Sequence, residues 1–250
     1  MAKVISIVNQ KGGVGKTTTT VNLGAALALE NKKILIIDFD QQANATITLG
    51  IKREDVIKDI VNFLLEECTN DVVLKISDSN LDLIPASLKI ASFEQMIQNV
   101  DNKELLLKNK LDALKDLYDY ILIDCPPALG LVIDNALYAS DSVIIPVECS
   151  FYAYDALTQM INKIDEIQKV KPLEIEGILL TKLDNRNTIG YNIVEKVKFE
   201  FPFKTFNTII SVSSHIQEAP MHGKSVIQFS YNSRGSKEYR DLAKEILEGK

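Results

Sequence analysis

Apolar residues gather in two kinds of segment that alternate along the whole chain. The shorter runs, of about four to eight residues, are apolar throughout, which is typical of strands that are buried on both faces. They cover residues 4–8, 33–37, 81–84, 120–123, 142–147 and 176–180, and six strands is a minimum. Because longer segments of helical period separate these runs, we predict βαβ units: an α/β fold with a mostly parallel, twisted sheet flanked by helices on both faces.

Two of the longer segments carry apolar residues at every third or fourth position, which is the spacing of one helix face. We expect both stripes to pack against the sheet. The first stripe consists of Val56, Ile57, Ile60, Val61 and Leu64, and the second consists of Leu157, Ile161, Ile164, Ile167 and Val170.

The composition is that of a globular protein. Of the 250 residues, 46% are apolar and 25% are charged, and 28 Lys and Arg against 34 Asp and Glu give a net charge of −6. These proportions exclude a disordered or low-complexity chain. The sequence has no internal repeat and no Gly/Ser/Pro-rich linker. We therefore expect a single domain over residues 1–250.

The chain has no apolar run of about 18 residues and begins with a strand pattern instead of a signal peptide, so we expect it in the cytoplasm. Its cysteines, Cys68, Cys125 and Cys149, are far apart and form no Cys-x-x-Cys pair. We expect reduced, buried thiols.

A glycine-rich segment follows the first predicted strand and opens a helical stretch that runs to about Glu30. Residues 9–18 read Asn-Gln-Lys-Gly-Gly-Val-Gly-Lys-Thr-Thr. Glycines let successive backbone N–H groups point at phosphate oxygens, and a helix N-terminus favours the same negative charge. Lys16 would meet the β- and γ-phosphates, and the Thr17 hydroxyl would bind Mg²⁺. We predict a P-loop NTPase domain whose nucleotide contacts Gly12, Gly13, Val14, Gly15, Lys16, Thr17 and Thr18.

The loop departs from the general P-loop pattern, because Gln10 replaces a glycine and Lys11 adds a second lysine. Here the chain resembles the deviant Walker A ATPases, and more narrowly the ParA partition ATPases of the Soj branch. The resemblance implies ATP as the nucleotide. It also implies a homodimer formed on ATP binding, in which Lys11 reaches the partner's ATP. Further motifs that carry it are Asp38-Phe39-Asp40 with Gln42 and Asn44, Ile123-Asp124-Cys125-Pro126-Pro127, Thr181-Lys182-Leu183-Asp184, and Glu218-Ala219-Pro220 with Gly223-Lys224.

Three acids stand at the carboxyl ends of predicted strands, where an open α/β sheet binds its ligands. Phosphoryl transfer to water needs Mg²⁺ and a residue that orients the water. In the resemblance Asp124 matches the Walker B acid, which holds Mg²⁺ through its water shell, and Asp40 matches the acid that acts on the attacking water. Asp38 is either a Mg²⁺-shell group or a structural group. The catalytic residues expected on these grounds are Lys11, Lys16, Asp40 and Asp124.

One departure and two further segments complete the predicted nucleotide site. The family has proline where this chain has Gln41, which would loosen the loop that sets Asp40. Residues 126–127 match a loop that senses the γ-phosphate. Thr181-Lys182-Leu183-Asp184 lies where related ATPases contact the adenine and sugar, although for Asp184 a role as a loop or cap residue fits equally well.

The resemblance also implies non-specific DNA binding, which depends on Lys and Arg that neutralise phosphates. Arg186 aligns with an arginine that contributes to DNA binding in Soj-like proteins. In place of the family's Pro-Arg-Asn-Val-Arg stretch, however, residues 211–215 read Ser-Val-Ser-Ser-His, which weakens or moves the DNA site. Acidic residues are interspersed, so a solvated mixed-charge face is the alternative. The other basic residues considered are Lys196, Lys198, Lys204, Lys224, Arg234, Lys237 and Arg240.

Taken as a whole, the resemblance predicts a nucleoid-associated switch that dimerises on ATP, coats DNA, hydrolyses ATP slowly and is stimulated by a ParB-like protein to drive plasmid or chromosome partition. The alternatives are a MinD-like membrane-associated ATPase, an Fe–S reductase, or an ATPase that positions another cargo. Residues 238–250 mix charges and offer no bulky aromatic face to lipid, so no stable membrane association is expected. The cysteines lack the context of a bridging Fe–S cluster.

Overall fold

The computed structural model of the protein describes residues 1–66, 71–76, 80–150, 153–184, 186 and 188–249. Within these residues the strands form one seven-stranded sheet in the order β3-β4-β2-β5-β1-β6-β7, and all neighbours are parallel except β3 and β4. The six predicted strands are confirmed, whereas the short β3 showed no apolar run. The strands are β1 (Lys3–Ile7), β2 (Ile34–Asp38), β3 (Leu74–Lys75), β4 (Leu81–Ile84), β5 (Tyr120–Asp124), β6 (Ser142–Glu148) and β7 (Glu174–Thr181).

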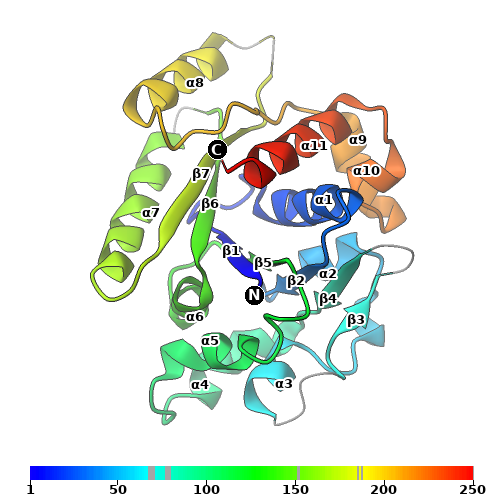
Figure 1. Ribbon diagram of the computed structural model, residues 1–250, viewed down its shortest axis with the longest axis vertical. Helices are drawn as coiled ribbons and strands as arrows, with labels where there is room; N and C mark the ends of the chain where they lie inside the picture. Colours follow the sequence, from blue (N-terminus) through cyan, green and yellow to red (C-terminus); the bar gives the residue numbers. More distant parts are fainter. Residues whose placement is uncertain (67–70, 77–79, 151–152, 185, 187, 250) are drawn as a thin grey trace.

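Helices cover both faces of this sheet (Figure 1). One face carries α1 (Lys16–Leu29), α2 (Asn44–Thr48), α9 (Ser214–Glu218), α10 (Val226–Phe229) and α11 (Arg234–Leu247). The other carries α3 (Ile60–Leu65), α4 (Phe93–Met96), α5 (Leu106–Leu111), α6 (Leu131–Ala139), α7 (Ala153–Gln168) and α8 (Thr188–Glu200). Short 3₁₀ turns are η1 (Arg53–Asp55), η2 (Leu88–Ser92), η3 (Lys103–Leu105) and η4 (Ala219–His222).

The central strands are buried on both sides. Successive side chains of a strand point to opposite faces, so Val4 enters one core layer and Ile5 the other, and both are fully buried. Helix α1 packs so close to the sheet that a Cβ atom on Gly24 would lie only 2.9 Å from Cδ1 of Ile36. This double burial explains why the strands read as continuous apolar runs.

The second helical stripe is confirmed in part. Leu157, Ile164 and Ile167 of α7 are buried, but Val170 is 70% exposed, so its assignment to the core is wrong. Helix α7 ends at Gln168, and the chain turns there toward β7. Lys171 secures the turn by donating to the carbonyl oxygens of residues 137, 138 and 140 at the end of α6.

The first stripe is also shorter than predicted. Ile60, Val61 and Leu64 are buried in α3, but Ile57 is 89% exposed and does not belong to the core. The reason is Asp59, whose carboxylate accepts hydrogen bonds from the backbone of residues 61 and 62 and so begins the helix at Ile60.

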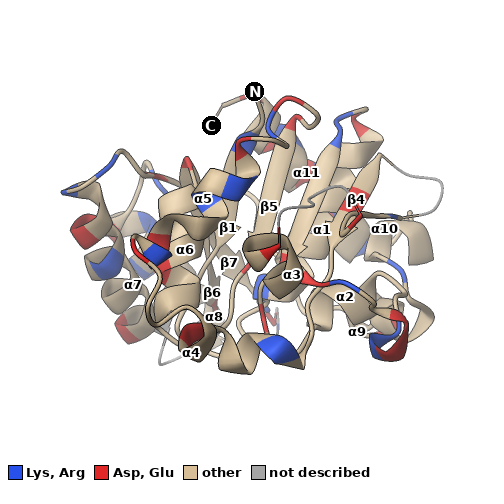
Figure 2. Cartoon of the chain, turned by 90° about the horizontal axis from the view of Figure 1, so that it is seen from below, with Lys and Arg blue, Asp and Glu red and all other residues tan. Residues whose placement is uncertain are grey.

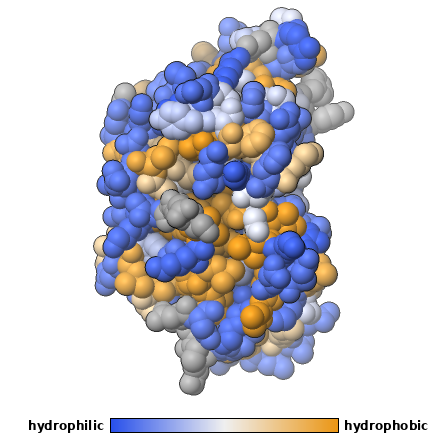
Figure 3. All heavy atoms as spheres, turned by 90° about the vertical axis from the view of Figure 1, so that its right-hand side faces the viewer, coloured by the Kyte–Doolittle hydropathy of each residue, from blue (hydrophilic) through white to orange (hydrophobic). Residues whose placement is uncertain are grey.

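No helix in the described ranges is long and apolar enough to span a lipid bilayer. Figure 3 shows the side that α2, β4, α9 and α10 occupy in Figure 1, where apolar side chains gather across the middle of the face. Cys125 and Cys149 are buried free thiols, as expected, and burial raises the pKa of Cys149 to about 12. Cys68 lies outside the described residues.

Candidate nucleotide site

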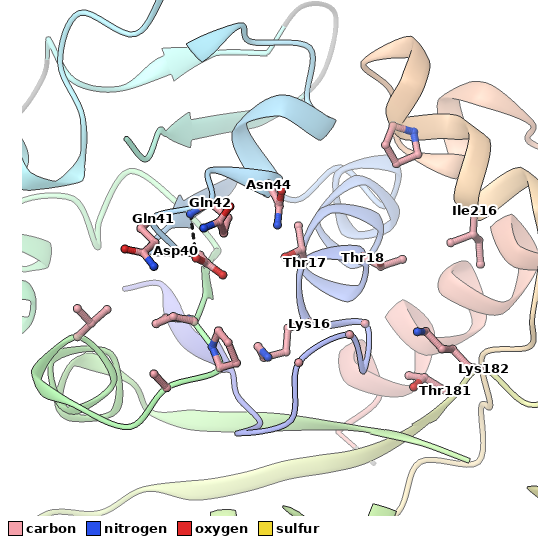
Figure 4. Close-up of a pocket in the computed structure, with 18 of the residues that line it drawn as sticks. Lys16, Thr17, Thr18, Asp40, Gln41, Gln42, Asn44, Thr181, Lys182 and Ile216 are labelled. Atoms are coloured by element: carbon pink, nitrogen blue, oxygen red, sulfur yellow. Dashed lines mark hydrogen bonds between the residues drawn. The ribbon is translucent and has the colours of Figure 1, made fainter. Parts of the chain in front are cut away.

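A cavity of about 990 Å³ lies beside the loop between β1 and α1, at the carboxyl ends of the central strands. Figure 4 shows Lys16 and Thr17 at its centre, Asp40 on one side, and Lys182 and Ile216 on the other. Parallel α/β sheets bind ligands at this edge. The cavity therefore joins the predicted phosphate loop to segments that are distant in the sequence.

The glycine loop has the conformation that its composition predicts. Gly13 and Gly15 adopt left-handed φ angles of +75° and +96°, and Gly15 is the N-cap of α1. A Cβ atom on Gly12 or Gly13 would meet nothing within 4 Å. The backbone is thus bare and faces the cavity in front of a helix N-terminus, which suits a phosphate group.

Two side chains hold this loop in place, a role that the sequence motifs containing them did not reveal. Asn9 donates to the carbonyl oxygen of Pro146 at 2.7 Å and accepts the backbone N–H of Lys11 at 2.9 Å. Thr181 donates to the carbonyl oxygen of Val14 at 2.8 Å. The loop is therefore tied to β6 and β7, and these partners lie too far away in the chain for spacing to reveal them.

Lys16 is a buried cation, with 7% of its surface exposed. Its ammonium group donates to the carbonyl oxygen of Lys11 at 3.2 Å, and it forms no ion pair within the described ranges. Burial lowers the pKa of Lys16, while the charges of Asp124 and Asp40 oppose this shift. A desolvated ammonium group that forms no ion pair with the nearby carboxylates is suited to bind an anionic ligand.

Asp124 supplies a carboxylate oxygen suited to a cation. It is fully buried, and its Oδ2 has no hydrogen-bond partner among the described residues, whereas Oδ1 accepts from Thr20 at 3.4 Å. Burial, and then the neighbouring charge of Asp38, raises the pKa of Asp124 well above its usual value. A hydrated Mg²⁺ would satisfy the unpartnered oxygen and remove that electrostatic cost, so the residues fit this metal.

Asp38 lies opposite Asp124 in the register of β2 and β5, but its oxygens are occupied. Oδ2 accepts from the backbone N–H and the hydroxyl of Thr46 at 2.8 and 2.7 Å, and Oδ1 accepts from Asp40 N at 3.2 Å. Burial raises the pKa of Asp38 to about 6. These bonds fasten α2 to the end of β2, and they favour the structural alternative over a place in the Mg²⁺ shell.

Asp40 faces the cavity from the turn that follows β2. Its Oδ1 accepts from Gln42 N at 3.0 Å, its carbonyl oxygen accepts from Ala43 N at 2.8 Å, and no described residue hydrogen-bonds to Oδ2. Ala43 completes the turn with a left-handed φ of +51°. Gln41 lines the cavity, and the hydrogen bonds of its neighbours close the turn without the family's proline.

Lys11 does not line the cavity. Its ammonium group lies 2.7 Å from Oε2 of Glu148 and 2.9 Å from the hydroxyl of Ser150. Glu148 also lies 3.9 Å from the ammonium group of Lys182. A contact of Lys11 with a nucleotide in a partner subunit stays a prediction, and it requires this side chain to leave Glu148.

Sequence reasoning predicted residues 181–184 at the base and sugar, and of these Thr181 and Lys182 line the end of the cavity away from the acids, whereas its lining residues from 210 to 217 were missed. Lys182 enters it with a left-handed φ of +54°. The remaining wall comes from Ile210, Ser211, Val212, Ser213, Ile216 and Tyr239. The departure from the family at residues 211–215 was the available signal for this wall, but the sequence analysis related it only to DNA binding.

Asp184 does not line this cavity. Its carboxylate accepts from the side chain of Arg186 at 2.9 and 3.0 Å, and these bonds lower the pKa of Asp184 to about 2. The geometry favours the loop-residue alternative, and a role at the base stays a prediction.

The loop after Asp124 lines the acid side of the cavity from Pro126 to Gly130. Glu94, which the sequence did not single out, also lines it and accepts the backbone N–H of Leu131 at 2.8 Å. Glu94 thus caps α6 from another element, where the N-cap Gly130 offers no side chain.

The predicted DNA residues lie in a mixed-charge setting. Arg186 pairs with Asp184, Arg234 pairs with Glu238, and Lys237 pairs with Asp241, whereas Lys204 and Lys224 are exposed. In Figure 2 both signs appear along α7 and near α9, and neither covers a whole face in that view. Lys196 lies over the ring of Tyr154, and Arg240 over the ring of Tyr231. A DNA surface on these residues stays a prediction.

Proteins of known name share both the sequence and the fold. A family model described as an AAA domain matches residues 2–176. The chain is 47% identical to the sporulation initiation inhibitor protein Soj of Bacillus subtilis, over 98% of each chain. It is 40% identical to the chromosome partitioning protein ParA of Myxococcus xanthus, over 99% of this chain and 88% of that protein. A cobyrinic acid a,c-diamide synthase from Mycobacterium smegmatis, solved with bound ADP and magnesium, has a TM-score of 0.86 at 28% identity and covers 99% of this chain and 94% of its own.

Proposed function

Because the chain belongs to the ParA/Soj family of partition ATPases, we propose that it is an ATP-dependent dimerising switch. In this proposal it binds DNA non-specifically, hydrolyses ATP slowly, and is stimulated by a ParB-like protein to drive plasmid or chromosome partition. The observation that carries the proposal is one cavity lined by a bare glycine loop and the buried Lys16, together with the unpartnered oxygen of Asp124, whose charge acts on Lys16.

The cavity has a polarity that orients ATP. Asp40 and Asp124 mark the side where Mg²⁺ and the γ-phosphate belong, and the loop of residues 12–18 would bind the chain of phosphates. The base then points toward the opposite end, where Ile210, Val212 and Ile216 offer apolar surface. The ADP and magnesium of the synthase with the same fold support this assignment of ligands.

The residues divide the work of hydrolysis. Thr17 and Asp124 would hold Mg²⁺, which neutralises charge on the phosphates when it is bound. Lys16 stabilises the negative charge that develops on the transferred phosphoryl group. Asp40 presents Oδ2, which no described residue occupies, to orient the attacking water.

Dimerisation depends on Lys11 in this proposal. We expect Lys11→Ala to bind ATP within about threefold of wild type, because Lys11 does not line the cavity, yet to remain monomeric with ATP. Light scattering with and without ATP measures the dimer, and calorimetry measures ATP affinity.

Lys108→Ala, on the exposed side of α5, is the matched control and should dimerise normally. An intact ATP dimer in Lys11→Ala would contradict the cross-subunit role. A wild-type chain that stays monomeric with ATP would contradict the switch itself.

One observation favours the alternative of a membrane-associated ATPase. The surface that would contact the membrane is not the C-terminal helix but the end of α8. Helix α11 buries Tyr239, Leu242 and Ile246 against the core, so its apolar side is not open to lipid. Near the end of α8, however, Phe199 and Phe203 are 86% and 99% exposed. Aromatic residues beside lysines enter membrane interfaces. ATP-dependent flotation with anionic liposomes, lost in Phe199→Ala, would support this second candidate over partition.

A further inference from the structure

The wall of the cavity at the base end belongs to a segment, residues 205–212, that runs beside β7. Backbone N–H groups of this segment donate to β7 and its extension: Phe206 to Ile178, Ile210 to Leu180, and Val212 to Leu183, at 3.1, 2.9 and 3.1 Å. The N–H groups of residues 207, 208 and 211 do not take part in this ladder. They need other partners, because unpaired backbone donors are costly in a folded protein.

Helix α11 supplies these partners through two glutamates that lie seven residues apart, and hence on one helix face. Glu245 accepts the N–H groups of Asn207 and Thr208 at 2.8 and 2.6 Å. Glu238 accepts the N–H of Ser211 at 2.9 Å with Oε2 and its hydroxyl at 2.7 Å with Oε1. Two carboxylates thus occupy the place that a further strand would take.

The two glutamates differ in what they hold. Glu245 contacts residues that do not line the cavity, whereas Ser211 lines it and is 4% exposed. The side chain of Glu238 is only 13% exposed, so water screens its bonds to Ser211 weakly. The same Oε1 that accepts from Ser211 also accepts from Nε of Arg234 at 2.8 Å. One carboxylate therefore connects the cavity wall to a candidate DNA residue.

We propose that Glu238 is a positioning residue that fixes Ser211 in the base-end wall of the nucleotide cavity and links this wall to Arg234. The inference rests on the proposed function for the identity of the ligands. A nucleotide that orders Ser211 also fixes the position of the Glu238 carboxylate. DNA that binds Arg234 removes a donor from Oε1 of the same carboxylate. When a DNA phosphate takes Arg234 away from Oε1, this oxygen is left to Ser211 alone, so DNA should strengthen the bond to Ser211 and with it ATP binding. Because coupling is reciprocal, ATP should tighten DNA binding by the same factor.

The test compares Glu238→Gln with Glu245→Gln. The second variant alters the same kind of contact to the same segment, but at residues that do not line the cavity. Calorimetry measures the affinity of each full-length protein for ATP and for inorganic tripolyphosphate. We expect Glu238→Gln to weaken ATP by about three- to tenfold, and Glu245→Gln by less than about twofold. Tripolyphosphate affinity should stay within about twofold of wild type in both variants, because the phosphate loop is untouched.

Ser211→Ala keeps the backbone N–H and removes the hydroxyl, so it tests the contact if Glu238→Gln folds poorly. Its effect on ATP affinity should be smaller and should not add to that of Glu238→Gln, because both changes remove the same bond. Equal losses of ATP affinity in Glu238→Gln and Glu245→Gln, or a loss of tripolyphosphate affinity as large as that of ATP, would overturn the positioning role.

The link to Arg234 is tested by repeating the ATP titrations with duplex DNA of random sequence. Wild type should bind ATP more tightly with DNA, and this gain should be absent in Glu238→Gln and present in Glu245→Gln. The same gain in Glu238→Gln would overturn the link. If wild type does not bind DNA, the DNA part of the proposed function and the link both fail, while the titrations without DNA still decide the positioning role.

Discussion

The two ends of the nucleotide cavity are built in opposite ways. The phosphate end comes from one continuous segment, residues 12–18, from Asp40 in the turn after β2, and from Asp124, the last residue of β5. The base end comes from residues 181–182, 210–213, 216–217, 220 and 239, which meet only through the packing of β7, α9 and α11. The phosphate end holds the buried charges of Lys16 and Asp124, whereas the base end offers mainly apolar surface, with Lys182 as its charged residue. The difference shows that groups which handle charge are encoded in local sequence, whereas the contour of the base end depends on distant contacts.

The strongest test of this comparison is Lys16→Ala. Lys16 is the buried cation of the phosphate end, so its loss should weaken ATP binding by at least about 100-fold. Calorimetry with Mg·ATP measures the effect, and Lys108→Ala is the control. Wild-type affinity in Lys16→Ala would refute the assignment of the phosphate end.

The second test separates binding from chemistry at the same end. Asp40→Ala removes the carboxylate that we propose to orient water, but it leaves the glycine loop, Thr17 and Asp124 to hold the ligand. Hydrolysis should fall by about 100-fold, while ATP affinity stays within about threefold. Phosphate release at saturating ATP, with calorimetry beside it, tests this prediction. Unchanged turnover would remove Asp40 from the catalytic residues.

The third test concerns the cost of burying acids at the phosphate end. The pKa of Asp38 is raised to about 6 in the folded chain, above its ordinary value. Because the pKa is raised, protonated Asp38 stabilises the folded state. This contribution to the free energy of unfolding is complete below about pH 4 and is lost as the pH rises through about 6. In Asp38→Asn this titration is absent. The free energy of unfolding of wild type should therefore fall relative to that of the variant by about 3 kcal/mol between pH 4 and pH 7.5.

Urea denaturation in EDTA at several pH values measures this difference. The variant is expected to be less stable in absolute terms, because an amide cannot accept all the bonds that Thr46 and Asp40 donate. A constant difference between the two proteins across this pH range would show that Asp38 titrates normally.

The smallest effect is expected at the base end. Ile216→Ala removes apolar surface from the cavity end where we propose that the base lies, and it should weaken ATP binding by about fivefold. Tripolyphosphate affinity should not change, because this ligand has no base. If both ligands lose affinity equally, the two ends are not separable as described.

Much of the fold and the phosphate end could be predicted from sequence. The six long strands read as apolar runs because both faces of the sheet are covered, and the glycine loop, Lys16, Thr17, Asp40 and Asp124 lie together at one edge as their strand positions indicate. The errors at Ile57 and Val170 are errors of helix boundaries. A capping aspartate begins α3 at Ile60, and a turn held by Lys171 follows the end of α7; apolar spacing does not reveal either boundary.

Local sequence determined the conformation of the phosphate loop and the order of strands and helices, because glycine φ angles and side-chain periodicity act within a few residues. Tertiary structure alone decided three hydrogen bonds: Thr46 donates to Asp38, Lys11 donates to Glu148, and Ser211 donates to Glu238. These partners are 8, 137 and 27 residues apart along the chain. A hydrogen bond depends on distance and direction in space, and the sequence specifies both only through the packing of the whole sheet and its helices.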